Sequence, residues 1–395
     1  MEIRTLASSD FEAFLELEGY AFHAVVDERR REKAQKVWAH AVGLGAFSEE
    51  GALQSALLIR PHKVFLYGKT IGMGGIGDVA SYPEARGQGN VRALMKESFR
   101  YMKDQQMLVS YLSPFSQSFY RKFGYELTFE ERTYKISPSD FQALDTGDRT
   151  VRRVRWEDEK ETLKRLYTQK YQQRIGPVNR EDWAWEEKKR WHDDLHVALC
   201  VDEKGKAEGY AIYRFQSPRP YVFVMNELVA LSGQAERALW QFIASHGPQF
   251  DHFKYKTGIS NRLTHLFPEM EVEQKLVPGM MARIVDMEAF LNAYPFKFAG
   301  KQAFELSVVD DESAEWNNGT YRLEMSETKR TISKTDSQTT TPRLEADIQT
   351  WTQLLMGTRT AQELQFQGRL RTDTQTAEDF QELLHDTAPE LYDFF

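Results

Sequence analysis

The first 136 residues alternate between apolar, strand-like stretches and amphipathic stretches with helical spacing. Ser8, Ser9 and Asp10 offer a helix start, and apolar side chains spaced by three and four predict another helix from Gly89. This order predicts an α/β fold with a mixed sheet. Strands are expected at 2–6, 52–60, 63–71, 72–82, 107–112 and 125–136, and further helices at 27–46 and 119–123.

The next stretch repeats this theme and indicates a duplicated domain. Asp78-Val79-Ala80 lies ahead of Arg92-Ala93-Leu94 in the first copy, and Glu227-Leu228-Val229 lies ahead of Arg237-Ala238-Leu239 in the second. The two intervals are 92 − 78 = 14 and 237 − 227 = 10 positions. The second copy therefore lacks four positions, which include the glycine-rich ones, and is expected to have lost the site of the first.

The pattern changes again after residue 285. Strands are expected at 301–309 and 319–325, and helices at the end of 344–355 and at 377–385. We therefore predict a smaller α+β domain behind two α/β domains with mixed sheets. The expected boundaries are 1–148, 149–285 and 286–395.

Composition and charge narrow the possible functions. Hydrophobic residues make up 41% of the chain and aromatic residues 13%, enough for packed cores. The net charge of −8 gives no electrostatic reason to bind nucleic acid and suits cationic small molecules. A single cysteine, Cys200, excludes an intramolecular disulfide and a thiolate cluster. With no signal-like or membrane-spanning stretch, a cytoplasmic protein without a membrane partner is expected.

A glycine-containing loop between a strand and a helix is the first candidate site. It reads Arg86-Gly87-Gln88-Gly89-Asn90-Val91-Arg92. Two glycines at a helix start let backbone N–H groups approach a pyrophosphate, and the helix dipole and Arg92 add positive potential. A plain turn that caps the helix explains the loop equally well. A dinucleotide site does not, because Arg92 occupies the third glycine position of that motif.

A second motif, about thirty residues later, favours the phosphate-binding interpretation. It reads Ser118-Phe119-Tyr120-Arg121-Lys122-Phe123-Gly124-Tyr125. Together the two motifs resemble the Gcn5-related N-acetyltransferase superfamily. Val91 departs from the small residue that is usual at its position. The chain resembles the enhanced-intracellular-survival (Eis) family over its whole length. The resemblance rests on that departure, on the two similar halves and on a smaller last domain that ends in phenylalanine. The third domain is then expected to resemble a sterol carrier protein.

The resemblance implies a set of site residues and acetyl-coenzyme A as cosubstrate, without a metal. Tyr120 matches the family's general acid, and the C-terminal carboxylate, here that of Phe395, matches its base. Phe115 and Ser116 fall at a further cofactor contact, although Phe115 is not the small polar residue expected there. The implied cofactor contacts are Val79, Ala80 and Ser81 for the pantetheine arm, and Gly87, Gln88, Gly89, Asn90, Val91 and Arg92 for the pyrophosphate.

Physical chemistry is consistent with these two roles. A neutral amine must attack the thioester, so a base takes a proton, and the departing thiolate gains from a proton donor. A tyrosine with an ordinary pKa of about 10 and a terminal carboxylate at about 3.5 both need local tuning. Other interpretations stay open: Tyr120 as a core aromatic, the terminal Phe394-Phe395 as a packing plug, and Asp27 and Glu28 as an exposed helix start rather than an amine pocket.

The function expected from these features is acetyl transfer to amino groups of cationic small molecules by direct attack in a ternary complex. The family resemblance suggests aminoglycosides, and it suggests a homo-oligomer, commonly a closed ring of six subunits. Two alternatives remain. One is acetylation of protein lysines, and the other is a non-catalytic lipid-binding or scaffolding protein.

Overall fold

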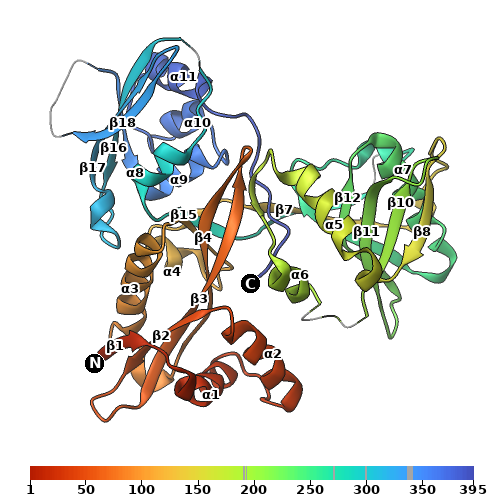
Figure 1. Cartoon of the computed structure of the whole chain (residues 1–395), viewed down its shortest axis with the longest axis horizontal. Coiled ribbons are helices and arrows are strands. Elements are labelled where there is room, and N and C mark those ends of the chain that lie inside the picture. The colour runs from red at the N-terminus through yellow and green to blue at the C-terminus, as the bar shows by residue number, and fades with distance from the viewer. Residues whose placement is uncertain (190–191, 193, 270–271, 299, 336–340) are drawn as a thin grey trace.

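The computed structural model describes residues 1–189, 192, 194–269, 272–298, 300–335 and 341–395. Within these residues the strands form three sheets, of eight, seven and four strands. Each sheet has helices packed against it, and the three units surround a central region that contains the C-terminus (Figure 1). No helix in the described part of the chain is long and apolar enough to cross a membrane. The expected class, two domains with mixed sheets followed by an α+β domain, is confirmed.

The first sheet has the order β1-β2-β3-β4-β5-β15-β6, and β9 pairs with β3. Only β4 and β5 run parallel, and the other pairings are antiparallel. Its elements are β1 (Glu2–Thr5), α1 (Phe11–Ala21), α2 (Glu28–Trp38), β2 (Val42–Phe47), β3 (Leu53–Leu66), β4 (Lys69–Ser81), α3 (Asn90–Asp104), β5 (Met107–Leu112), α4 (Gln117–Arg121), β6 (Glu126–Leu127), β9 (Ile175–Val178) and β15 (Met281–Ile284).

Two expectations for residues 27–71 were wrong. The predicted helix 27–46 ends at Trp38, and 42–47 is the strand β2. There Gly43 and Gly45 make room for the side chain of Leu6, which a Cβ at either position would approach within 3 Å. The strands predicted at 52–60 and 63–71 are largely one strand, β3. It continues through Pro61, which pairs with Gly74 of β4 on one side. On the other side β2 pairs only as far as Ile59, so no N–H of residue 61 is needed there.

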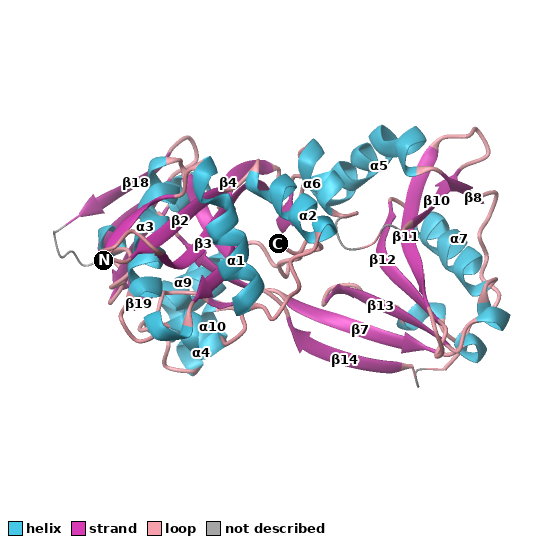
Figure 2. Cartoon of the chain, turned by 90° about the horizontal axis from the view of Figure 1, so that it is seen from below, coloured by secondary structure: helices cyan, strands magenta, loops and turns pink. Residues whose placement is uncertain are grey.

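The second sheet has the order β14-β7-β13-β12-β11-β10-β8. Strands β12 and β13 are parallel, as β4 and β5 are in the first sheet. Figure 2 shows β7, β13 and β14 side by side, reaching from the centre of the molecule into this domain. The elements are β7 (Glu130–Ile136), β8 (Thr150–Val154), α5 (Trp156–Tyr171), α6 (Asp182–Glu187), β10 (His196–Val201), β11 (Ala207–Gln216), β12 (Val222–Ala230), α7 (Gly233–Ala244), β13 (His252–Gly258) and β14 (Glu273–Pro278).

The first two sheets exchange strands. The segment 125–136 was expected to close the first sheet, but only β6 lies there, and β7 pairs with β13 and β14 of the second sheet. In return, β15 enters the first sheet between β5 and β6. The chain crosses at Phe129, whose backbone bonds with Met280 and Gly279. The boundaries 1–148, 149–285 and 286–395 stay a prediction, because each of the first two sheets contains strands from both sides of residue 149.

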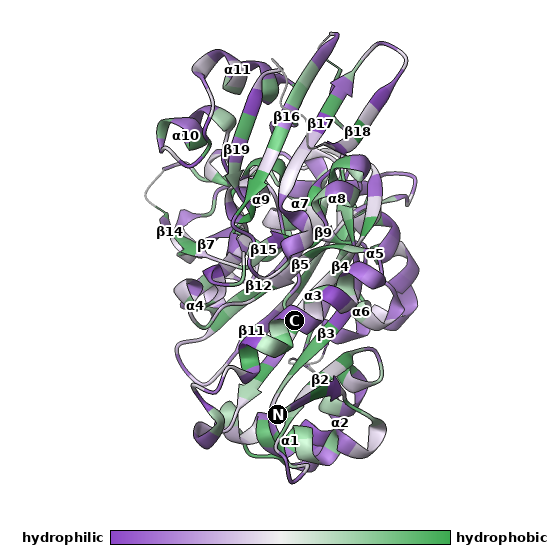
Figure 3. Ribbon diagram, turned by 90° about the vertical axis from the view of Figure 1, so that its left-hand side faces the viewer, coloured by the Kyte–Doolittle hydropathy of each residue, from purple (hydrophilic) through white to green (hydrophobic). Residues whose placement is uncertain are grey.

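The third sheet has the order β18-β17-β16-β19, with β16 and β19 parallel. Its apolar face continues into the first domain through one shared core, which includes Val109 and Tyr111 of β5 and Trp351. Figure 3 shows hydrophobic stretches along β3 and β16. The elements are α8 (Met287–Ala293), β16 (Gln302–Val309), β17 (Gly319–Met325), β18 (Arg330–Thr335), β19 (Arg343–Asp347), α9 (Ile348–Leu355), α10 (Ala361–Phe366) and α11 (Thr374–Glu382).

Candidate active site

The site begins where the two parallel strands of the first sheet separate. Strand β4 pairs with β5 from Gly72 to Ile76 and then continues to Ser81 beyond the last pair. On its other side β4 has a bulge: Leu58 of β3 pairs with Gly77 and Ala56 pairs with Ala80. A bulge bends its strand and increases the local twist. The backbone groups of 77–81 on the β5 side are therefore available to a ligand.

A cavity of about 1200 Å³ lies at this separation. It brings together eleven of the thirteen residues that the sequence singled out, from four separate segments of the chain. These are Val79, Ala80, Ser81, Gly87, Gly89, Asn90, Val91, Arg92, Phe115, Tyr120 and Phe395.

Two predicted cofactor residues do not line this cavity. The side chain of Gln88 turns back and donates from Nε2 to the carbonyl oxygen of Glu84 at 2.8 Å. The hydroxyl of Ser116 accepts from the backbone N–H of Phe119 and so caps α4. Both side chains therefore have local structural partners, and their roles toward a cofactor stay predictions.

The glycine loop presents backbone rather than side chains to the cavity. Gly87 and Gly89 have φ values of +78° and +86°, which favour glycine, and nothing lies within 4 Å of a Cβ at either position. Gly89 is the N-cap of α3, and the first turn of α3 carries no acidic residue. The N–H groups and the positive dipole end of α3 are thus left for an anion, beside Arg86 and Arg92.

Tyr120 lies on the short helix α4 and is nearly buried among aromatic rings. Its exposed fraction is 3%, and its ring centroid lies 5.5 Å from that of Phe115, 5.1 Å from Phe119 and 6.2 Å from Tyr125. Burial raises the pKa of Tyr120 to about 12. The hydroxyl therefore keeps its proton at neutral pH and can serve as a proton donor.

The chain end lines the same cavity. The ring of Phe395 packs on Gly75 of β4, where a Cβ would lie 2.7 Å from the ring carbon Cδ2. Its centroid lies 5.1 Å from that of His62, which stacks on Trp183. Phe395 is 8% exposed, whereas Phe394 is 67% exposed. Only the last of the two terminal phenylalanines is therefore an anchor.

Sequence reasoning missed several polar residues at this site. Arg60 of β3 is buried and forms an ion pair with Asp78 at 2.7 Å, and both line the cavity. Glu18 of α1 pairs with Arg30 of α2 at the cavity wall. His62 is half-buried beside Phe395, and desolvation lowers its pKa to about 4, so it is neutral at pH 7. The signal available was the arginine within the apolar run 56–61.

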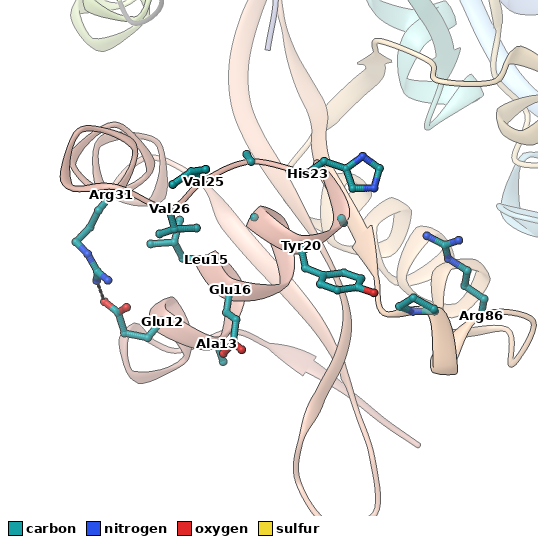
Figure 4. A pocket seen from close by; sticks show the side chains of 14 residues that line it. Glu12, Ala13, Leu15, Glu16, Tyr20, His23, Val25, Val26, Arg31 and Arg86 are labelled. Carbon is teal, nitrogen blue, oxygen red and sulfur yellow. Dashed lines mark hydrogen bonds and ion pairs between the residues drawn. The ribbon is translucent and has the colours of Figure 1, made fainter.

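A second hollow, of about 1030 Å³, adjoins the first (Figure 4). It lies along α1, with Glu12 paired to Arg31 of α2 on one side and Arg86 of the glycine loop on the other. Arg86 lines both hollows. Asp27 instead accepts from the N–H of Arg30 and is exposed, so its interpretation as a helix start is confirmed.

Comparison with protein families explains this arrangement. Models of the acetyltransferase (GNAT) domain match residues 2–128 and again 176–284, and a model of the sterol carrier protein domain matches 287–392. The N-acetyltransferase Eis of Mycobacterium tuberculosis (strain CDC 1551 / Oshkosh) is 25% identical over 311 residues, which cover 75% of this chain and 74% of the relative. The chain belongs to the Eis family of Gcn5-related N-acetyltransferases.

Solved structures agree with this assignment. A probable N-acyltransferase from Enterococcus faecalis V583 is 34% identical and superimposes with a TM-score of 0.93, covering 100% of this chain and 99% of that one. Eis1 from Mycobacterium abscessus is 20% identical with a TM-score of 0.80 and 100% coverage of both chains, which shows the common fold. This Eis-family protein is therefore an N-acetyltransferase.

The cavity suits the cosubstrate that GNAT acetyltransferases use, acetyl-coenzyme A. The open positions beside Gly87 and Gly89 admit a pyrophosphate next to the start of α3. Asn90 is 2% exposed, and its Oδ1 accepts no hydrogen bond from the described part of the chain. The open edge of 77–81 can pair with an extended amide-bearing arm.

The packing of Phe395 on Gly75 can be tested directly. Gly75→Ala places a methyl group against the ring, so the ring must move and the chain end should loosen. Hydrogen–deuterium exchange of the 386–395 peptide should then be faster than in the wild-type protein. Gly233→Ala is the matched control. Gly233 lies at the start of α7, and a Cβ there would meet only the guanidinium end of Arg237. Equal protection of the chain end in all three proteins would contradict this packing.

Proposed function

We propose that this Eis-family enzyme transfers an acetyl group from acetyl-coenzyme A to an amino group of a cationic small molecule, by direct attack in a ternary complex. One observation carries the proposal. A single cavity joins the glycine loop at the start of α3, a tyrosine that keeps its proton and the chain end of Phe395. We also propose that the enzyme is a cytoplasmic homo-oligomer, with the closed ring of six subunits that the family resemblance implies.

The cofactor roles follow the walls of the cavity. Val79, Ala80 and Ser81 pair with the pantetheine arm through their backbone groups, as an added strand would. The segment from Gly87 to Arg92 holds the pyrophosphate, with Gln88 acting through its N–H because its side chain is bonded elsewhere. Phe115, at 75% exposure, offers an apolar ring at the cavity wall. Ser116 keeps α4, and with it Tyr120, in place.

The proposed reaction needs one base and one acid. The cosubstrate supplies the acetyl group as a thioester. The amine nitrogen forms a bond to the acetyl carbon, and the carbon–sulfur bond breaks. The carboxylate of Phe395 takes the proton that the amine loses, and the Tyr120 hydroxyl gives a proton to the sulfur. Direct transfer needs no further nucleophile, and Cys200 is buried in the second domain, away from the cavity.

The carboxylate of Phe395 favours a cationic acceptor, whereas three further basic side chains that line the cavity suit the anionic cosubstrate. Glu18 and Asp78 line the cavity, and the carboxylate of Phe395 adds a third negative charge. Arg30 and Arg60 are ion-paired with the first two, which leaves the carboxylate to attract an ammonium group. A multiply charged amine such as an aminoglycoside, the substrate class that the family resemblance suggests, fits this arrangement.

A screen of acetyl-coenzyme A consumption would test this assignment. Aminoglycosides, polyamines and lysine-containing peptides should be compared at equal concentration. We expect kcat/KM to be highest for an aminoglycoside and to fall as the salt concentration rises, because charge attraction is screened. A preference for lysine peptides would favour the protein-acetylating alternative. No consumption with any amine would overturn the proposal.

Tyr120→Phe tests the acid. The change removes only the hydroxyl, so acetyl-coenzyme A should bind as before while kcat falls about 10²–10⁴-fold. Tyr101→Phe, which removes a hydroxyl from the partly buried Tyr101 of α3, provides the control. Calorimetric binding and steady-state turnover give the two readouts. If turnover stays within threefold of the wild type, Tyr120 is a packing residue.

Lengthening the chain tests the base. Two glycines added after Phe395 would move the terminal carboxylate by about 3.5 Å per residue, beyond proton-transfer reach. We expect a lower kcat with little change in cofactor affinity. High pH should partly restore kcat, because more of the amine is then neutral in solution. Phe395→Leu, which keeps the carboxylate and an apolar anchor, should be milder. Full activity of the extended protein would assign the base elsewhere.

A further inference from the structure

The chain end contacts β9 of the first sheet and then the second domain before it enters the active-site cavity. The N–H of Glu390 donates to the carbonyl oxygen of Ile175 at 3.1 Å. The ring of Tyr392 lies 4.8 Å from that of Tyr171 on α5. Asp393 then forms an ion pair with Arg180 at 2.8 Å. Two residues later, Phe395 lies in the active-site cavity.

Arg180 belongs to a buried cluster of charges in the second domain. It is fully buried and forms a two-fold contact with Glu227 of β12, which also pairs with Lys188 at 2.9 Å. The Tyr210 hydroxyl donates to Glu227 at 2.6 Å. Burial alone would raise the pKa of Glu227, but Arg180 and Lys188 lower it to about 2. Glu227 is therefore charged at neutral pH.

Among the residues that the structure describes, the charges in this cluster balance only with the chain end in place. Arg180 and Lys188 carry two positive charges, and Glu227 supplies one negative charge. Asp393 supplies the second, at 2.8 Å from Arg180 and 3.6 Å from Lys188. An uncompensated buried charge is costly, so the cluster favours the position of the chain in which Asp393 is inserted.

The cluster lies where the second sheet separates. Strand β12 pairs with the parallel strand β13 only from Val222 to Met225, and Glu227 lies beyond the last pair, as Asp78 does in β4. At the end of β13, a Cβ on Gly258 would lie 3.3 Å from Tyr392 Oη. The chain end thus occupies in the second domain the kind of opening that forms the cavity in the first.

We propose that Arg180 and Lys188 are positioning residues, which bind Asp393 and thereby fix Phe395 in the active site of the first domain. The proposal rests on the role proposed above for the carboxylate of Phe395. Two residues span at most about 7 Å, so an anchor at Asp393 leaves the terminal carboxylate little freedom. The packing of the Phe395 ring on Gly75 provides the second fixed point.

Asp393→Asn tests the anchor, because it removes the charge and keeps the size of the side chain. We expect kcat to fall at least tenfold, with an unchanged KM for acetyl-coenzyme A and partial recovery at high pH. Carboxypeptidase A should also release phenylalanine from the variant faster than from the wild type. Lys188→Met should act in the same direction, and Asp393→Glu should recover part of kcat.

Glu208→Gln is the matched control. It removes the charge of a carboxylate that pairs with Arg149 at 3.1 Å in the second domain. The two carboxylates are similarly shielded from solvent, with side-chain exposures of 18% for Glu208 and 11% for Asp393. A merely structural ion pair would lower stability in both variants alike. If Asp393 acts as an anchor, Glu208→Gln should lower stability without changing the pH profile of kcat or the rate of phenylalanine release.

The outcomes separate this proposal from the function it rests on. Wild-type kcat and carboxypeptidase resistance in Asp393→Asn, together with an inactive Gly-Gly extension, would overturn the anchor and leave the base in place. Full activity of the extended protein would remove the proposed role of Phe395 itself. A kcat loss in Asp393→Asn that only follows its loss of folded protein would also overturn the anchor.

Discussion

The separation of two parallel strands is the constraint on which this enzyme depends. While β4 and β5 remain paired, their backbone groups satisfy one another. Beyond Ile76 the bulge at Asp78 and Val79 bends β4 away, and its backbone groups must find other partners. An extended cosubstrate arm can provide them. The glycine loop, Tyr120 and Phe395 are all placed around that opening.

The second domain makes the same opening and uses it differently. Its loop between β12 and α7 is only two residues long, so the glycine-rich segment of the first copy has no counterpart. The charged side chains of Arg180, Lys188 and Glu227 lie at this opening instead, and Asp393 of the chain end balances their charge. In the proposals above, the first copy binds the cosubstrate and the second copy holds the chain end that the first copy uses.

Local motifs were predictable from the sequence, and contacts between distant segments were not. Gly87, Gly89 and Tyr120 lie in short motifs that carry their meaning within a few residues. Arg60 stands out in the apolar run 56–61, but its pairing with Asp78 depends on the fold, as the contact of Arg180 with Asp393 does. Strand β7 was expected in the wrong sheet because an alternating pattern specifies a buried face, not a partner. The role proposed for Phe395 came from the family resemblance alone.

The insertion of β15 has a consequence for how the protein is made. Strand β15 lies between β5 and β6 in the first sheet, but it follows nearly the whole second domain in the sequence. During synthesis the catalytic domain therefore cannot complete its sheet until residues 281–284 have left the ribosome, although domains usually fold in the order in which they emerge. Until then, the facing edges of β5 and β6 lack their partner. The two acetyltransferase-like domains must mature together rather than one after the other.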